Sequence, residues 1–531
     1  MIRSISVLLA SFISLLAMAQ SQIPFSLSLT DKTVSGINGI HSFAFGQHGS
    51  YVVFVGGRTD GIHPRQPFAA FQTAGNNQKI ILWNTQTDQV IETSVTVLPQ
   101  DLQEHLQSTN MNFHQNGDTL YIAGGYAYSP SSLDHKTFPF LCTIELGRLT
   151  DSMLAGGDIS AAIQQIQDPY FAVTGGHLSY LGDDFYLVGG HQFDGRYNPM
   201  GNATYTQTYT DAVRVFKVQV NGGLQVSDKR SMSDANHLHR RDYNLMTYAK
   251  DNSNVGLMIS SGVFQAQQDL PFLYPVFIDS MSYTPRTSFN QYLSHYHSAS
   301  ATLYDAAKDD NYMVFFGGLS QYYYDGAQLI KDDQVPFVKT ISIVKLDALD
   351  SLEELALPTS MADFSGASAE FVPLMNLANI HNEVLLLDSM QGDSILIGYI
   401  VGGIRSTSLN PFSNNTIANT SADNRIKAVY VHPNQTTGVQ KMSTPNPIEM
   451  QISPNPARHR MRIHLNQQPM HHLRYKISTL DGRVVSEFYS DTKMDQYEII
   501  LQPEAQQQIL LLQVEIDGQY RYSRPFVQQS R

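Results

Sequence analysis

The sequence is poor in cysteine, tryptophan and charged residues. It holds one cysteine and one tryptophan among 531 residues, and Asp, Glu, Lys and Arg together make up 15%. A single cysteine excludes an intramolecular disulfide, so a chain of this length is expected to rest on a large apolar core. Cys142 stands in the apolar run 140–144, where we expect a small buried side chain rather than a nucleophile.

The sequence also lacks a basic stripe. Lys and Arg number 34 against 47 Asp and Glu, which gives a formal net charge of −13. This balance excludes a nucleic-acid partner, which requires clustered positive charge. No Gly-x-Ser-x-Gly, phosphate-binding loop or zinc-binding helix motif is present.

Only the N-terminus carries a long apolar run. Arg3 precedes the apolar stretch 5–17, and Ala17-Met18-Ala19 forms a small-x-small cleavage site before Gln20. This order predicts a signal peptide over residues 1–19. The run of about 13 residues is short for a permanent membrane helix. We therefore expect export to the periplasm and no transmembrane segment after cleavage.

A short pattern of apolar residues followed by Gly-Gly recurs six times. The pairs are Gly56-Gly57, Gly124-Gly125, Gly189-Gly190, Ser261-Gly262 (with Ser in the first place), Gly317-Gly318 and Gly402-Gly403. A strand and a tight turn precede each pair, and a polar loop, a third strand and a more polar fourth strand follow. Six units of four strands without helical periodicity predict an all-β chain with a β-propeller. The strand at 25–29 is expected to complete the last unit and close the ring.

These six Gly-Gly strands resemble the kelch family, to which the central domain of galactose oxidase belongs. The resemblance implies a six-bladed kelch-like β-propeller over residues 20–440. The Tyr and Trp that kelch repeats usually carry later in each blade are mostly missing, so no kelch subfamily is implied. We expect the glycine pairs to be structural, because strand exits near the axis need positive φ and lack room for a Cβ atom.

Residues 447–531, after a linker at 441–446, change character. Short alternating strands at regular spacing predict a small immunoglobulin-like β-sandwich. Pro454-Asn455-Pro456-Ala457, then Asp481-Gly482-Arg483-Val484-Val485, then a final strand and Asp517-Gly518 resemble the C-terminal sorting domain of type IX secretion cargo in Bacteroidota. Gln508-Ile509-Leu510 replaces the Gly-Ile/Val-Tyr that usually opens the last long strand of that family. The resemblance implies the type IX secretion machinery as a partner of 447–531, and a secreted or cell-surface destination.

Long loops follow the second strand of every unit, and they share one face of the predicted propeller. Tyr, Asn, Gln and Arg are frequent in them, which suits sugar rings or peptides, although loop packing also explains many of the tyrosines. Four histidines recur near the start of the first strand: His41, His177, His239 and His297. Asn112 and Ser365 fall near that position in the other two units, and together these residues are expected to form a partial polar ring there. His237-x-His239 and His295-x-His297 could chelate a metal, but no carboxylate partner accompanies them, and we expect neither a metal nor a cofactor.

The predicted ligand-binding residues combine these histidines with the arginines and aspartates of the same end. They are His41, Arg58, Asp60, His177, His191, Arg196, His239, Arg240, Arg241, His297 and Arg405. No catalytic residue is assigned.

The composition and the predicted face favour a binding or interaction module for a glycan or protein outside the cell, rather than an enzyme. The alternative is a kelch-type carbohydrate-active enzyme, either a sugar isomerase or a lyase, in which a histidine base acts beside an arginine. An oxidase is disfavoured, because its copper site needs a Tyr–Cys cross-link and Cys142 stands in an apolar strand. Passive surface architecture is a third reading.

Overall fold

The structure is a computed structural model that describes residues 21–200, 204–326, 328–433, 435–442, 450–465, 472–479, 483–492, 494–502, 508–516 and 520–529. The predicted signal peptide at 1–19 and most of the predicted linker at 441–446 lie outside these residues. The chain divides into two compact units, residues 1–442 and 443–531.

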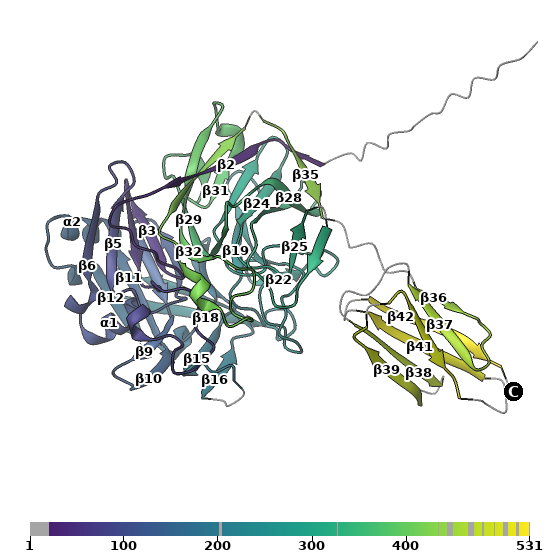
Figure 1. The fold of residues 1–531 in the computed structure, drawn as a ribbon. Helices are drawn as coiled ribbons and strands as arrows, with labels where there is room; N and C mark the ends of the chain where they lie inside the picture. Colours follow the sequence, from purple (N-terminus) through teal and green to yellow (C-terminus); the bar gives the residue numbers. More distant parts are fainter. Residues whose placement is uncertain are drawn as a thin grey trace, which may run out of the picture. The chain divides into compact units, whose positions relative to one another are not determined.

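The first unit consists almost wholly of antiparallel β-sheet, which confirms the all-β prediction (Figure 1). Its first sheet comprises β3 (Ala44–His48), β4 (Tyr51–Val55), β5 (Lys79–Asn84) and β6 (Val90–Ser94). Its second sheet comprises β7 (Asn112–Asn116), β8 (Thr119–Ala123), β11 (Phe140–Glu145) and β12 (Ile163–Gln167). The third comprises β13 (His177–Leu181), β14 (Asp184–Val188), β17 (Ala212–Gln219) and β18 (Gln225–Ser233).

Three more sheets repeat this four-strand order. The fourth has β19 (Asn244–Ala249), β20 (Val255–Ser260), β21 (Val276–Asp279) and β22 (Ser282–Pro285). The fifth has β23 (Ser300–Asp305), β24 (Asp310–Phe316), β27 (Thr340–Leu346) and β28 (Leu352–Ser360), extended by β35 (Thr437–Lys441) and β1 (Ser21–Ile23). The sixth has β29 (Phe364–Pro373), β32 (Ile395–Ser406), β34 (Ile426–His432) and, from the other end of the chain, β2 (Ser26–Lys32).

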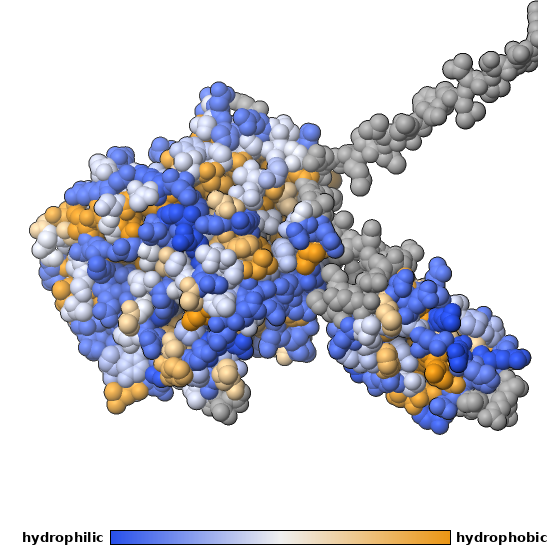
Figure 2. Space-filling model, viewed as in Figure 1, coloured by the Kyte–Doolittle hydropathy of each residue, from blue (hydrophilic) through white to orange (hydrophobic). Residues whose placement is uncertain are grey.

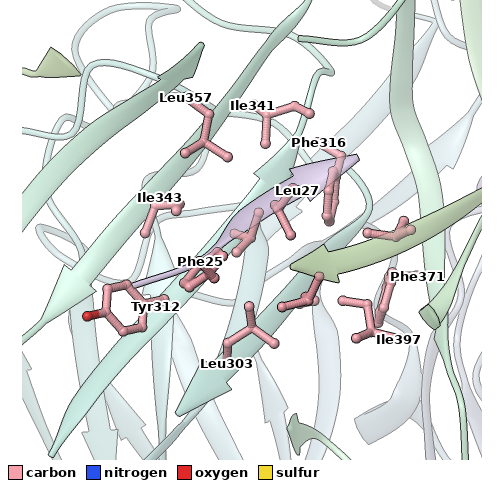
Figure 3. Close-up of a cluster of buried hydrophobic side chains, with 14 of the residues drawn as sticks. Phe25, Leu27, Leu303, Tyr312, Phe316, Ile341, Ile343, Leu357, Phe371 and Ile397 are labelled. Atoms are coloured by element: carbon pink, nitrogen blue, oxygen red, sulfur yellow. The ribbon is translucent and has the colours of Figure 1, made fainter. Parts of the chain in front are cut away.

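Strand β2 closes the unit, as the sequence predicts. It pairs along its whole length with β34. Phe25 and Leu27 are buried between side chains of the fifth and sixth sheets, and the Phe25 ring meets that of Tyr312 edge-on at 5.3 Å (Figure 3). The last sheet is therefore built from strands of both ends of the unit. Because β2 pairs with β34, the edge of β34 is not left unpaired.

A ring of six backbone hydrogen bonds joins the six sheets. Each N–H donates to the carbonyl of the next member in the order Ser42, Ser368, His297, Asp242, Gly175, Asn110 and back to Ser42, at 2.7–3.2 Å. These residues lie at or just before the first strand of each sheet. All except His297 have positive φ, between 49° and 65°. We call these six residues the inner ring.

The glycine pairs take the conformation that the sequence predicts. All six pairs have positive φ at both positions, including Ser261 at 56°. Ser261 shows that a side chain is accepted at this backbone angle in one repeat, where its hydroxyl donates to the carbonyl of Phe272 at 2.7 Å.

Several elements were not predicted from the sequence. Two helices, α1 (Gln100–Leu106) and α2 (Leu146–Leu154), pack between strands of the first two sheets. Three of the long loops fold into hairpins: β9 (Tyr126–Ser129) with β10 (Asp134–Thr137), β15 (His191–Gly195) with β16 (Tyr205–Tyr209), and β25 (Tyr322–Asp325) with β26 (Gln328–Lys331). The short strand β33 (Thr420–Ala422) pairs with β32. Cys142 is buried on β11, as expected.

The second unit has two antiparallel sheets around one core. One comprises β36 (Met450–Ser453), β37 (Arg460–Leu465) and β40 (Gln496–Ile500). The other comprises β39 (Val484–Ser490), β38 (Leu473–Thr479), β41 (Gln508–Ile516) and β42 (Tyr520–Gln528). Alternate residues such as Met461, Ile463 and Ile477 point into the core, while large apolar residues of β39 remain at the surface of this unit (Figure 2). No helix in the described part of the chain is long and apolar enough to span a membrane.

Candidate functional site

A cavity of about 410 Å³ opens above the inner ring, and all six ring residues line it. The long loops of all six repeats supply the rest of its wall, including Phe71, Tyr126, Phe193, Tyr197, Phe264 and Phe337. Its volume lies within the usual range of about 300–1,000 Å³ for small-molecule sites. The cavity therefore lies on the face to which the sequence assigned the ligand.

Positive φ at the inner ring shapes the cavity. Ser42, Asn110, Asp242 and Ser368 are non-glycine residues in the left-handed region, a conformation that costs free energy and persists only where the surroundings impose it. Here the closed ring of hydrogen bonds imposes it. The side chains of successive repeats are thereby presented around one common axis.

The first charged pair of the cavity wall is Arg58 with Asp60. The guanidinium donates to both carboxylate oxygens, at 2.9 and 2.5 Å, and to the amide oxygen of Asn76 at 2.8 Å. Burial opposes the charge of Asp60, but hydrogen bonds from His41 and Arg58 outweigh it and lower the pKa to about 2. Arg58 is only 2% exposed. This pair is a fixed part of the wall.

The second pair is Arg241 with Asp242, a ring residue. Arg241 forms an ion pair with Asp242 and donates to the Tyr209 hydroxyl at 3.0 Å, and its guanidinium lies over the Phe264 ring at 4.6 Å. Burial disfavours the charge, yet the Asp242 carboxylate dominates and raises the pKa of Arg241. The guanidinium is thus held charged and oriented at the cavity.

The third pair joins His297, also in the ring, to Glu370 at 3.3 Å. Burial opposes protonation of His297, but the carboxylates of Glu370 and Asp242 outweigh it and raise its pKa. The neighbouring His177 behaves oppositely: burial, and then the charge of His297, lower its pKa to about 3. The two imidazole rings lie 5.2 Å apart, so one cavity holds side by side a histidine whose pKa is raised and a histidine whose pKa is lowered.

The tautomer of His177 follows from its single hydrogen bond. Nε2 lies 2.6 Å from the carbonyl oxygen of Tyr243 and must carry the proton, because a carbonyl can only accept. Nδ1 therefore keeps its lone pair. Burial also lowers the pKa values of His41 and His63, the latter to about 4, so these imidazoles are neutral as well.

Two polar atoms of lining side chains, Thr109 Oγ1 and Asn410 Oδ1, are buried and lack a hydrogen-bond partner among the described residues. Buried polar groups are normally satisfied, and each unsatisfied one costs roughly 1–3 kcal/mol. Both belong to the wall of one cavity, which is also lined by Arg241 and Glu370.

Six of the predicted binding residues line the cavity: His41, Arg58, His177, His191, Arg241 and His297. Asp60 stands behind Arg58. The remaining four do not line it, and two have other partners. His239 stacks on Tyr209 and pairs with Asp211 at 2.7 Å, while Arg240 is fully buried and donates to three carbonyls, of His237, Ser261 and Tyr274.

Arg196 is exposed, and Arg405 lies on β32 and is not among the residues that line the cavity.

The four recurring histidines do not occupy equivalent places, because only His297 is a ring member. Asn112 and Ser365, which the sequence aligns with them, are replaced in the ring by Asn110 and Ser368. In the sixth sheet a β-bulge between Phe364 and Ala367 displaces the register.

Glu370 and most aromatic lining residues were not among the predicted binding residues. Glu370 lies opposite Val401, the residue before Gly402-Gly403, just as His177 lies opposite Val188 before Gly189-Gly190. Counting backwards from each glycine pair across the hairpin would have identified it. His237 and His295 have other hydrogen-bond partners, and among the described residues no three His, Cys, Asp or Glu side chains are arranged to hold a metal ion.

Comparisons with known proteins add little. No protein-family model matches the chain, and no curated protein matches it. A solved structure titled "Structure of YjhT" is 11% identical, with 77% of this chain and 99% of that chain covered and a TM-score of 0.42. A glycoside hydrolase family 43 arabinoxylan arabinofuranohydrolase from Bacillus subtilis is 9% identical, with 93% and 96% covered and a TM-score of 0.27. Both likenesses are weak and have no bearing on the site.

Proposed function

We propose that the first unit is a six-bladed, kelch-like β-propeller that binds a carbohydrate in the cavity above its inner ring. The six four-stranded sheets, the closing strand β2 and the closed ring of hydrogen bonds support this architecture. The observation that carries the function is the cavity itself: aromatic walls together with charged and polar side chains around the inner ring.

The chemistry of the cavity suits a neutral polyhydroxylated ligand. Each of its three cation–anion pairs is internally balanced, and the carboxylates of Asp269 and Asp333 also line it. The side-chain oxygens of Glu370 and Asn410 are acceptors for sugar hydroxyls, while aromatic faces pack on the apolar faces of pyranose rings.

The test is a glycan array probed with the chain from residue 20 onward and with single variants. Tyr197→Ala removes one aromatic side chain of the cavity wall, and Glu370→Gln replaces one carboxylate oxygen by an NH₂ group. We expect each change to weaken binding at least tenfold. Arg196→Ala, next to Tyr197 but exposed and outside the cavity, is the matched control. Binding that survives both cavity variants, or no binding to any glycan, would overturn the proposal.

A second candidate function is a sugar isomerase, favoured by the His177–His297 pair. Groups whose pKa values are pushed apart in one site are a usual acid–base arrangement. The neutral Nδ1 of His177 would remove a proton from the carbon beside an open-chain carbonyl, while protonated His297 gives its proton to the carbonyl oxygen. His177 then returns its proton to the former carbonyl carbon while the other enediol hydroxyl returns a proton to His297, which forms the isomeric carbonyl. Proton NMR in D₂O detects this exchange, and His177→Asn should abolish it while preserving binding.

We propose further that the second unit is an immunoglobulin-like type IX sorting domain that delivers the chain to the outside of the cell. The motif order at 454–457 and 481–485 supports this, together with the two-sheet core. In a type IX secreting bacterium, removal of 447–531 should leave the protein in the periplasm. Secretion of the shortened chain would contradict the assignment.

A further inference from the structure

One of the six connections between the first and second strands differs from the others. Four of the turns are short, such as Gly117-Asp118 and Gly182-Asp183, and the one at 250–254 is little longer. In the sixth sheet, residues 374–394 separate β29 from β32 and form β30 (Asn379–Ile380) and β31 (Val384–Leu386). We call residues 374–394 the plug segment.

The plug segment reaches inner strands of three other sheets. Strand β31 pairs in parallel with β23 of the fifth sheet. Glu383 accepts a hydrogen bond from Thr247 of β19 at 2.6 Å, and it lies 3.2 Å from His114 of β7, in the second sheet. Sheets two and four are separated by the third, so Glu383 must stand across the axis of the unit.

Apolar contacts anchor the plug segment in this place. Ile380 and Val384 are buried against Ala249 and Tyr304, from the fourth and fifth sheets. Burial of apolar side chains, the hydrogen bond to Thr247 and the strand pairing with β23 therefore all hold the plug segment in position. In Figure 1, β31 lies at the opposite end of the first unit from the hairpins β9–β10 and β15–β16, which stand on the side of the cavity.

The cavity ends before it reaches the plug segment. None of the residues 374–394, all of which the structure describes, lines it. Among its lining residues is Phe113 of β7, whose ring meets Phe45 of β3 edge-on at 5.4 Å. His114, the next residue of β7, already contacts Glu383. The plug segment thus stands across the axis of the unit beyond Phe113.

Aromatic side chains from three of the long loops also meet at the cavity. The His63 ring contacts Phe71 at 4.6 Å, Tyr197 at 4.6 Å and Phe412 at 5.4 Å, from loops of the first, third and sixth sheets. All four side chains line the cavity. These loops meet at one point, so a ligand enters between them rather than lying across an open groove.

We infer that the cavity takes the terminal sugar of a glycan chain end-on, or a short free saccharide, and does not bind internal stretches of a polysaccharide. This inference rests on the proposed carbohydrate function and specifies its ligand class. A chain cannot pass through a channel that is closed at one end, so recognition is limited to the sugar residues that fit between the long loops and the plug segment. The aromatic and polar side chains of the wall then contact the hydroxyl groups of that terminal unit.

The first test uses matched forms of each glycan that binds on the array. The probes are the glycan itself, the same glycan shortened by one terminal residue with an exo-glycosidase, and free oligosaccharides of its linkage from one to six residues. Trimming should weaken binding at least tenfold, and the Kd should stop improving after about three residues, because a cavity of this class holds a drug-sized ligand. Isothermal titration calorimetry measures both.

Equal binding of the intact and trimmed glycans, or a Kd that improves steadily through six residues, would overturn the end-on inference and leave carbohydrate binding standing. No glycan binding at all would overturn both, so the two failures are distinguishable. A second variant replaces residues 375–393 by Asn-Gly, the type of turn that serves other repeats. If the plug segment sets the limit, longer saccharides should gain affinity for this variant, whereas Glu383→Gln, which keeps the segment, should retain the limit.

Discussion

At the scale of single residues, backbone conformation decides where the sheets can approach one another. Gly124 has φ of 68°, and a Cβ atom there would lie 1.8 Å from the carbonyl oxygen of Val173. Gly117 has nearly the same φ, 60°, but open space around it. The two glycines therefore separate the cost of the left-handed backbone from the cost of a clash between sheets.

We expect Gly117→Ala to lower the free energy of unfolding by about 1–2 kcal/mol, the usual cost of a left-handed residue with a side chain. Gly124→Ala should cost about 1–3 kcal/mol more, because the neighbouring backbone must also move. Urea denaturation of both variants measures the difference. Equal losses would mean that the contact with Val173 relaxes freely.

His295 makes the first unit sensitive to acid. Its Nε2 donates to the carbonyl of Gln291 and its Nδ1 accepts from the N–H of Gln321, so only the neutral ring satisfies both contacts. Burial lowers its pKa to about 4. In the unfolded chain a histidine titrates near pH 6.5. The stability that His295 contributes is therefore present above about pH 6.5 and is lost as the pH falls to about 4.

The expected loss from this residue approaches about 3 kcal/mol, at 1.36 kcal/mol for each unit of pKa difference. We predict that His295→Gln flattens the decline of unfolding free energy between pH 6.5 and 4, measured by urea titration at each pH. His48→Gln, at an exposed histidine paired with Asp118, is the control and should leave the slope unchanged. An unaltered slope in both would show that His295 does not titrate with unfolding.

The neighbours Arg240 and Arg241 show why the sequence does not predict which side chains face the cavity. Arg241 reaches the cavity and pairs with Asp242, whereas Arg240 points the other way and lies between Phe272 and Tyr274, its guanidinium 4.2 and 4.7 Å from their rings. Burial lowers its pKa to about 10. The side chains of consecutive residues at a turn point in different directions. Only the backbone angles determine which of the two faces the cavity.

At the scale of elements, strand β2 carries more of the stability than its seven residues suggest. Phe25 just before it is fully buried and contacts Tyr312 of the fifth sheet, so the N-terminal segment joins two sheets at once. We predict that Phe25→Ala lowers the unfolding free energy by about 3–5 kcal/mol, as for other large buried aromatics. Ser26→Ala, whose side chain bonds only an exposed Gln435, is the control, with an expected change below about 0.5 kcal/mol.

The strands themselves were predictable from the sequence. Each glycine pair marks the end of a second strand, and alternating apolar and polar residues mark the other strands. The plug segment and the three hairpins were not. Their sequences, such as His191 to Gly195 and Tyr205 to Tyr209, are polar and rich in tyrosine, and they read as loops. They pair because the rigid sheets below bring them together, which is a tertiary cause that local pattern does not contain.

At the scale of the whole molecule, the two units have separate cores. The second unit's core contains only residues of its own strands, such as Leu473, Leu512 and Phe526. We predict two independent unfolding transitions by differential scanning calorimetry of the full chain. Ending the chain at Met442 should remove one and leave the Tm of the other within about 2 °C, a shift that corresponds to less than about 1 kcal/mol. A large shift would reveal coupling between the units.

The inner ring is made of backbone atoms only, and its six members are Ser42, Asn110, Gly175, Asp242, His297 and Ser368. Five residue types serve the same hydrogen-bonding role, but five of the six positions have positive φ, which glycine and small polar residues adopt at the lowest cost. Exchange among such residues can alter what the cavity recognises while the frame that holds it persists. The molecule thus separates the part of its sequence that must be kept from the part that is free to diversify toward new ligands.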